Sequence, residues 1–176
     1  MYDLLSEAQG IIAELDLFAI LSRHGEARLV GSVALDLIVK LDIDIHLLVG
    51  TSELLAVADN ICRQILDGGL VHEVRLSDYR GEGGVKIGID AYPARSGDWS
   101  IDLWVTEHLE ATAFAFVDQM KAQLRPEHRE DILAIKRDLF WRGELRQGLS
   151  MLIYQAVVED GVRTASAFRE WTMRRG

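Results

Sequence analysis

Two aspartates stand at the start of an apolar strand, and this feature limits what the chain can be more than any other. Polar and apolar residues alternate through Asp42-Ile43-Asp44-Ile45-His46, and Leu47-Leu48-Val49 follows. Because side chains alternate between the two faces of a strand, Asp42, Asp44 and His46 share one face. Neighbouring carboxylates repel each other and lose hydration. The pair therefore indicates a bound cation, and Mg²⁺ prefers carboxylate, phosphate and water oxygens as ligands.

A glycine–serine pair precedes these aspartates. Leu29-Val30 predicts a short strand, Gly31-Ser32 breaks it, and Val33–Val39 predicts a short helix. Glycine lets the backbone approach a ligand closely, and a helix start offers unpaired N–H groups to phosphate. Ser32 can cap that helix or donate its hydroxyl to a phosphate oxygen. A nucleoside triphosphate site is the favoured interpretation, and a tight turn with a capping serine is the competing one.

These pieces, in the order Val30-Gly31-Ser32, Val33–Leu41 and Asp42-Ile43-Asp44, resemble the signature of the polymerase β-type nucleotidyltransferase superfamily. The small Gly-Ser…Asp-x-Asp members, of the antibiotic-modifying or minimal kind, are the most similar. The resemblance covers residues 29–49. Asp36 departs from it, because the family more commonly has glycine or a small residue there.

The resemblance also implies a third carboxylate on a later strand. Asp102, in Ile101-Asp102-Leu103, is the preferred candidate because its strand is the more continuous, and Asp90, in Ile89-Asp90-Ala91, is the alternative. A hairpin symmetric about Ser96 would place Asp90 and Asp102 directly opposite each other. Opposed carboxylates need something positive between them, either the metal or an arginine such as Arg75 or Arg95.

By resemblance, the catalytic and metal-binding residues are Asp42, Asp44 and Asp102, and they would hold one or two Mg²⁺ ions. Gly31 and Ser32 would contact the triphosphate. A basic side chain from the C-terminal helices would reach it as well, and Lys136 is the candidate, with a solvated helix face as the competing interpretation. For His46 a structural role is favoured. Trp104 is a better candidate than Tyr154 for an aromatic near a ligand.

The periodicity along the chain predicts the fold class. Helical spacing covers residues 3–23 and 54–65, and a period of two covers residues 71–79, 85–92 and 99–105. Further helices are expected at residues 109–123, 126–141, 144–159 and 162–174. The prediction is an α/β (α+β) fold with a mixed, mostly antiparallel sheet of about five strands, helices on one face and a C-terminal helical bundle.

Two domains are expected, a nucleotidyltransferase-like α/β domain at residues 1–107 and a helical domain at residues 108–176. The active site is expected in the cleft between sheet and bundle. The lone Cys62 favours a reducing cytoplasm, and neither a secretory signal nor an apolar span is found. The net charge of −9 argues against a nucleic-acid partner. The expected partners are an NTP and an unidentified acceptor, and a homodimer is left open.

The predicted function is a Mg²⁺-dependent enzyme, a nucleotidyltransferase that moves a nucleoside monophosphate from NTP to a hydroxyl of a small molecule or protein and releases pyrophosphate. The alternative is a catalytically silent binding module with the same fold, comparable to family members that are paired with toxin or antitoxin partners. A phosphatase or a sugar-nucleotide glycosyltransferase ranks lower, because the apolar strand follows Asp42 here and does not precede it.

Overall fold

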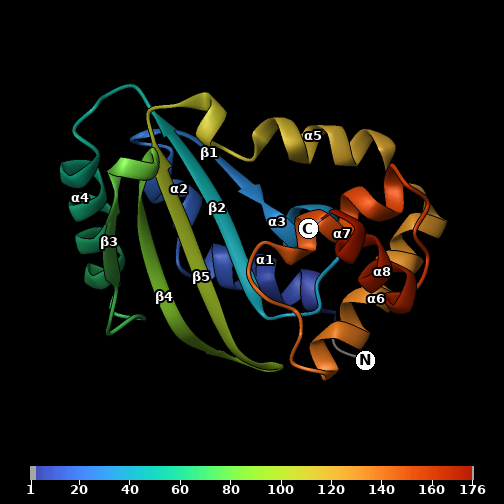
Figure 1. The fold of residues 1–176 in the computed structure, drawn as a ribbon. Coiled ribbons are helices and arrows are strands. Elements are labelled where there is room, and N and C mark those ends of the chain that lie inside the picture. The colour runs from blue at the N-terminus through green and yellow to red at the C-terminus, as the bar shows by residue number, and fades with distance from the viewer. Residues whose placement is uncertain (1–2, 176) are drawn as a thin grey trace. The chain divides into compact units, whose positions relative to one another are not determined.

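A computed structural model describes residues 3–175, and their packing forms two compact units (Figure 1). The first unit comprises residues 3–36 and 41–117, and the second comprises residues 37–40 and 118–175. The chain passes from the first to the second at Val117 and Asp118, within the helix α5 (Phe114–Gln123). The expected division into domains at 107–108 stays a prediction.

The first unit is built on a five-stranded sheet with the strand order β1-β2-β5-β4-β3. Its strands are β1 (Gly25–Val30), β2 (Asp42–Val49), β3 (Arg75–Tyr79), β4 (Gly84–Ala94) and β5 (Gly97–Thr106). Strand β2 runs parallel to β5, and the other neighbouring strands are antiparallel. This mixed, mostly antiparallel sheet confirms the predicted fold class.

The sheet forms because alternate residues of its central strands are buried. On β2, Ile43, Ile45 and Leu47 have no exposed surface, and the intervening residues are half-buried. Equivalent apolar side chains of β4 and β5 complete the layer: Val85, Ile87, Ile89, Ile101, Leu103 and Val105. Removing this area from water is the main stabilising contribution to the unit.

Helices cover that apolar face. They are α1 (Leu4–Glu14), α2 (Leu17–Leu21) and α4 (Leu54–Asp67), and they lie on the same side of the sheet (Figure 1). Helix α4 buries Ala58, Ile61 and Ile65, whose spacing of three and four residues forms one helical stripe. It packs on β3, β4 and β5, while α2 packs on β1. The opposite face of the sheet carries the polar side chains.

Some elements differ from their predicted bounds. The helix expected over residues 3–23 is divided at Asp16, whose φ of 49° is left-handed and cannot continue a right-handed helix. The expected Val33–Val39 helix is the shorter α3 (Gly31–Leu35), which ends at Asp36 with φ 55°. A left-handed residue at a helix end is a conformation that glycine adopts most easily, and here an aspartate adopts it.

The β4–β5 hairpin is also less symmetric than expected. Its turn is Arg95-Ser96, and the register shifts between Ile89 and Tyr92. As a result Asp102 pairs with Gly88, and the predicted direct opposition of Asp90 and Asp102 is wrong. A register shift of this kind is a bulge, which bends and twists a strand locally. Two single-turn 3₁₀ helices, η1 (Arg80–Glu82) and η2 (Leu109–Ala111), flank this part of the sheet in the chain.

The second unit consists mainly of α6 (Pro126–Trp141), α7 (Leu149–Val158) and α8 (Ala165–Arg175), which pack on one another. Its core side chains share almost complete burial and are Ile132, Ile135, Leu139, Ile153, Val157 and Phe168. Pro126 occupies the first helical turn of α6, where its missing N–H costs nothing. Along the described stretch, no helix has both the length and the apolar character that crossing a bilayer requires.

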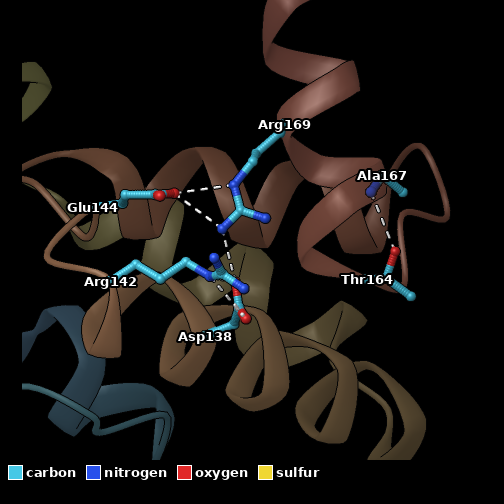
Figure 2. Close-up of polar contacts among 6 residues, drawn as sticks. All are labelled: Asp138, Arg142, Glu144, Thr164, Ala167 and Arg169. Atoms are coloured by element: carbon cyan, nitrogen blue, oxygen red, sulfur yellow. Dashed lines mark hydrogen bonds and ion pairs between the residues drawn. The ribbon is translucent and has the colours of Figure 1, made fainter.

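An arginine network ties these helices together at the surface. Arg169 of α8 donates to Asp138 of α6 at 2.8 Å and to Glu144, which follows α6, at 3.0 Å (Figure 2). Arg142 also donates to Asp138, at 3.1 Å. The hydrogen bond from Arg169 is the largest cause that lowers the pKa of the Asp138 carboxyl below its ordinary value.

Candidate active site

Asp42 and Asp44 lie on the polar face of β2, as the alternation predicts. Both side chains are half-buried, whereas Ile43 and Ile45 between and after them have no exposed surface. The buried isoleucines fix the strand against the helical layer, because a rotation of the strand would expose them to water. The two carboxylates are therefore held on one face of a rigid strand.

Asp102 lies beside Asp44. In the parallel pairing of β2 with β5, Asp44 is the register partner of Asp102, and Asp42 is the partner of Ser100. Register partners project from the same face of a sheet, and adjacent strands are about 4.8 Å apart. The sheet thus brings the three predicted carboxylates together on one face, across two neighbouring central strands.

Gly31 meets these carboxylates at the end of β1. Val30, the residue before it, is the register partner of Asp44, and Gly31 has a φ of +65°. A Cβ atom at this position would overlap an oxygen of Asp44 and lie 3.1 Å from its Cγ. Both the left-handed backbone and the close approach of Asp44 therefore require glycine here.

Ser32 also reaches the carboxylates. Its side chain is buried, and its hydroxyl donates to Oδ1 of Asp42 at 3.4 Å. Helix α3 has only five residues, so its dipole is weak and the predicted phosphate contacts would rest on the Ser32 hydroxyl and nearby N–H groups. Gly31, Ser32, Asp42, Asp44 and Asp102 form one cluster in the first unit, which we call the carboxylate cluster.

The alternative third carboxylate, Asp90, lies apart from Asp44. It is on β4, at the register shift, and two strand positions away from β2 in the sheet. It forms an ion pair with Arg75 of β3, one of the two arginines that the sequence suggested as its partner. The geometry therefore favours Asp102, the neighbour of Asp44, as the third member.

Lys86 is a charged neighbour of the cluster that sequence reasoning missed. Its ammonium lies 2.7 Å from Oδ2 of Asp102. The alternation of β4 does place Lys86 and Gly88 on the face that Asp102 shares. The pairing of β4 with β5 that brings Lys86 close to Asp102 could not be predicted from the sequence, because it depends on the irregularity between Ile89 and Tyr92.

His46 has a structural role on the same face. Its Nδ1 accepts a hydrogen bond from the backbone N–H of Ala113 at 3.0 Å, which requires the neutral ring to carry its proton on Nε2. Burial lowers the pKa of His46 to about 4, because desolvation disfavours the charged imidazolium. Trp104 is the register partner of His46 on β5, and its ring lies 6.2 Å from that of Tyr79.

Lys136 lies in the second unit, on α6, and is almost completely buried. Its ammonium donates to the backbone oxygen of Leu37 at 2.6 Å and to the hydroxyl of Tyr154 at 3.0 Å. These bonds compensate for removing the charge from water. They connect α6 with α7 and with residues 37–40 inside that unit, and a role at the triphosphate stays a prediction.

The donor set of the carboxylate cluster fits a hard divalent cation. Three carboxylates and a hydroxyl supply only oxygen ligands, which Mg²⁺ prefers. A Cβ on Gly88 would lie 3.7 Å from Oδ1 of Asp102, whereas the space beside Gly31 is taken by the Asp44 carboxylate itself. Among residues 3–175, no group of three acidic, histidine or cysteine side chains is placed so that it could hold a metal ion. In this structure Asp102 is instead paired with the Lys86 ammonium.

Comparison with known proteins adds evidence on the fold. No protein-family model and no curated protein sequence matches the chain significantly. Among solved structures, it is similar to a cytoplasmic RNA terminal U-transferase, with a TM-score of 0.54 and 17% identity over 77% of this chain and 39% of that chain. It is also similar to the Cid1 poly(U) polymerase bound to MgGTP, with a TM-score of 0.53 and 18% identity over 77% and 42% of the two chains.

Cid1 in complex with the UTP analogue UMPNPP is a further match, with a TM-score of 0.52 and 12% identity over 77% of this chain and 41% of that chain. The chain thus spans about two fifths of the length of these neighbours. At these identities the likeness concerns the fold, which is that of nucleotidyltransferases.

Proposed function

We propose that this protein is a metal-dependent nucleotidyltransferase that moves a nucleoside monophosphate from an NTP to a hydroxyl of a small molecule or protein. One observation carries the proposal: Asp44 and Asp102 are register partners on neighbouring central strands, directly beside the Gly31-Ser32 corner. Two half-buried carboxylates in that relation repel each other, and a divalent cation that prefers oxygen ligands would offset this repulsion. The nucleotidyltransferase fold of the matched structures supports the same interpretation.

Each residue of the carboxylate cluster has a role in this proposal. Asp42, Asp44 and Asp102 would hold one or two Mg²⁺ ions, and such ions, when bound, neutralise a triphosphate and acidify an acceptor hydroxyl. Ser32 would turn its hydroxyl from Asp42 to a phosphate oxygen. Asp102 would accept the proton of the acceptor hydroxyl as its oxygen bonds to the α-phosphorus. The bond from that phosphorus to the β-phosphate bridging oxygen breaks, and pyrophosphate leaves.

A cavity suggests where an acceptor could enter. It has a volume of about 310 Å³ and lies on the β3–β4 side of Gly88, with Arg75, His72 and Asp90 among its polar lining residues. Across the sheet, Gly31 and Ser32 lie on the β1–β2 side of Asp102, and this cavity lies on the other side.

The negative charge of the chain favours a small or proteinaceous acceptor. The matched structures include an RNA terminal U-transferase and a poly(U) polymerase, which act on RNA. This chain has a net charge of −9, and an acidic surface repels a polyanion. UTP should be included among the tested nucleotides.

The expected location is the cytoplasm, because the single Cys62 is free.

A second candidate function is a catalytically silent binding module with this fold. The specific observation in its favour is the ion pair between Lys86 and Asp102, which neutralises the third carboxylate without a metal. In a silent module this pair would be permanent. In an enzyme it has to open when the metal binds.

Pyrophosphate release separates the two candidates. Purified protein is incubated with each of the four labelled NTPs, Mg²⁺ and a panel of hydroxylated acceptors, and the same reactions are repeated with Asp42→Asn and Asp44→Asn. We expect release with the wild type and a loss of at least roughly 100-fold in either variant, because both remove a metal ligand. Asp138→Asn, which changes an aspartate of the second unit, serves as the matched control. Release that is unaffected by the Asp42 and Asp44 changes would contradict the proposed enzyme.

A further inference from the structure

The Lys86–Asp102 ion pair involves the carboxylate that would ligate metal. The ammonium is 2.7 Å from the carboxylate oxygen, and the two side chains are 32% and 38% exposed. A charge-assisted contact of this length is a full hydrogen bond. It neutralises Asp102 on the face where Asp44 lies beside it in register.

The local sequence of β4 makes this contact possible. The residue directly opposite Asp102 is Gly88, and Lys86 lies two positions earlier, opposite Trp104. A Cβ at position 88 would lie 3.7 Å from Oδ1 of Asp102, so glycine leaves this carboxylate accessible from β4. The lysine therefore reaches Asp102 diagonally across the pair of strands, a separation that long side chains span.

The Lys86 ammonium and a metal ion would compete for this carboxylate. The ammonium contacts Oδ2 of Asp102, a metal ion would also take a carboxylate oxygen, and two cations this close repel each other. Lysine is a flexible point charge that can leave, unlike the planar two-pronged contact of an arginine. The contact is also partly exposed, so breaking it costs little.

We propose that Lys86 is the resident counter-ion of Asp102 in the metal-free protein and has to be displaced when a divalent cation binds. The inference rests on the proposed function, because it assumes that Asp102 is a metal ligand. Lys86 is thus a positioning residue, which keeps Asp102 next to Asp44 without a metal and lowers the affinity for metal. Binding of the cation frees its ammonium for other anions.

The test measures binding of Mn²⁺ alone, from the electron paramagnetic resonance signal of free Mn²⁺. We expect Lys86→Gln to raise the Mn²⁺ affinity by roughly 3- to 10-fold, because it removes a competitor from Asp102. Lys86→Arg keeps a competing charge and should not raise the affinity. Arg75→Gln is the matched control, since it removes one positive charge from the same sheet but from Asp90, and screening should limit its effect to less than about 2-fold.

The outcomes distinguish this inference from the proposed function. An unchanged or lower affinity in Lys86→Gln, with wild-type binding that Asp44→Asn abolishes, overturns the role of Lys86 alone. An equal gain in Arg75→Gln also overturns it, because the effect would then be general electrostatics. Mn²⁺ binding that is absent from the wild type and from Lys86→Gln overturns both proposals.

A second measurement covers the case in which Lys86→Gln does not fold. In the wild-type protein, the NMR signal of the Lys86 side-chain Cε, assigned by comparison with Lys86→Arg, is followed during a Mg²⁺ titration. Displacement predicts a change that saturates with metal binding. A signal that stays constant while metal binds overturns the inference.

Discussion

The molecule contains two groups of aspartates whose positively charged partners differ. In the second unit, Asp138 accepts from Arg142 and Arg169, and Arg169 also holds Glu144 (Figure 2). In the first unit, Asp102 lies between Asp44 and the ammonium of Lys86. The first arrangement joins helices through guanidinium forks, and the second places carboxylates side by side on a sheet.

The difference shows what makes an acidic cluster suitable for chemistry. An arginine fork satisfies carboxylate oxygens in fixed directions and is hard to exchange for another cation. On the sheet, Gly31 lets the Asp44 carboxylate approach the backbone, Gly88 puts no side chain directly opposite Asp102, and the cation in contact with Asp102 is a flexible lysine. Rigid strands position these carboxylates, while the lysine beside Asp102 is easier to exchange than an arginine.

The largest effect is expected from Gly31→Ala. The added methyl group would overlap the Asp44 carboxylate, and alanine is strained at a φ of +65°. Together these should lower the free energy of unfolding by about 3 kcal/mol, measured by urea denaturation, and displace Asp44. Gly88→Ala is the control, because its methyl group would make only ordinary contacts at 3.7 Å or more. Equal free energies of unfolding for Gly31→Ala and Gly88→Ala would show that position 31 does not require glycine.

A smaller effect is expected from pH, through His46. Its pKa of about 4 in the folded protein lies below the ordinary 6.5, so the unfolded chain binds more protons between these values. Stability from this group is therefore complete above pH 6.5 and falls as the pH is lowered toward 4. The loss should be on the order of 2 kcal/mol, allowing for the part of the ring that stays exposed.

The matched variant is His46→Asn, which keeps an acceptor for the N–H of Ala113 but does not titrate. Unfolding is followed by urea denaturation from pH 7 to pH 4. The wild type should lose more stability than His46→Asn over this window. Parallel pH profiles of the two proteins would rule out a buried neutral histidine.

The smallest effect is expected from Arg169→Ala in the second unit. Its two ion pairs are partly exposed, so the loss of stability should be small and should shrink as salt is added. A double-mutant cycle with Asp138→Ala isolates the coupling between the two residues. Mn²⁺ binding should be unchanged, because this network belongs to the helical unit. A large change in the Mn²⁺ affinity of Arg169→Ala would show that the arginine network and the carboxylate cluster are not independent.

The sequence predicts the parts of the site that local patterns encode. Alternation around Ile43 and Ile45 places Asp42 and Asp44 on one face, and the Gly31-Ser32 break places a corner next to them. Both follow from side-chain period and glycine chemistry, which operate over a few residues. The number of strands and the helices around them also follow from the apolar segments along the chain.

Features that depend on long-range pairing could not be predicted in this way. The contact of Lys86 with Asp102 depends on a register shift in β4, and the pairing of Asp44 with Asp102 depends on β5 lying next to β2. No local pattern specifies either. The break at Asp16 was missed for another reason, since the apolar spacing continues through it while the backbone becomes left-handed.

The most direct test of the account is calorimetric binding of MgATP and MgUTP to the wild type and to three aspartate variants. If the carboxylate cluster is the triphosphate–metal site, Asp44→Asn and Asp102→Asn should weaken binding by at least roughly 10-fold. Asp138→Asn, in the arginine network, should bind within about 2-fold of the wild type. Equal affinities of all four proteins, or no binding of either nucleotide to the wild type, would contradict the assignment of Asp44 and Asp102 to one triphosphate–metal site.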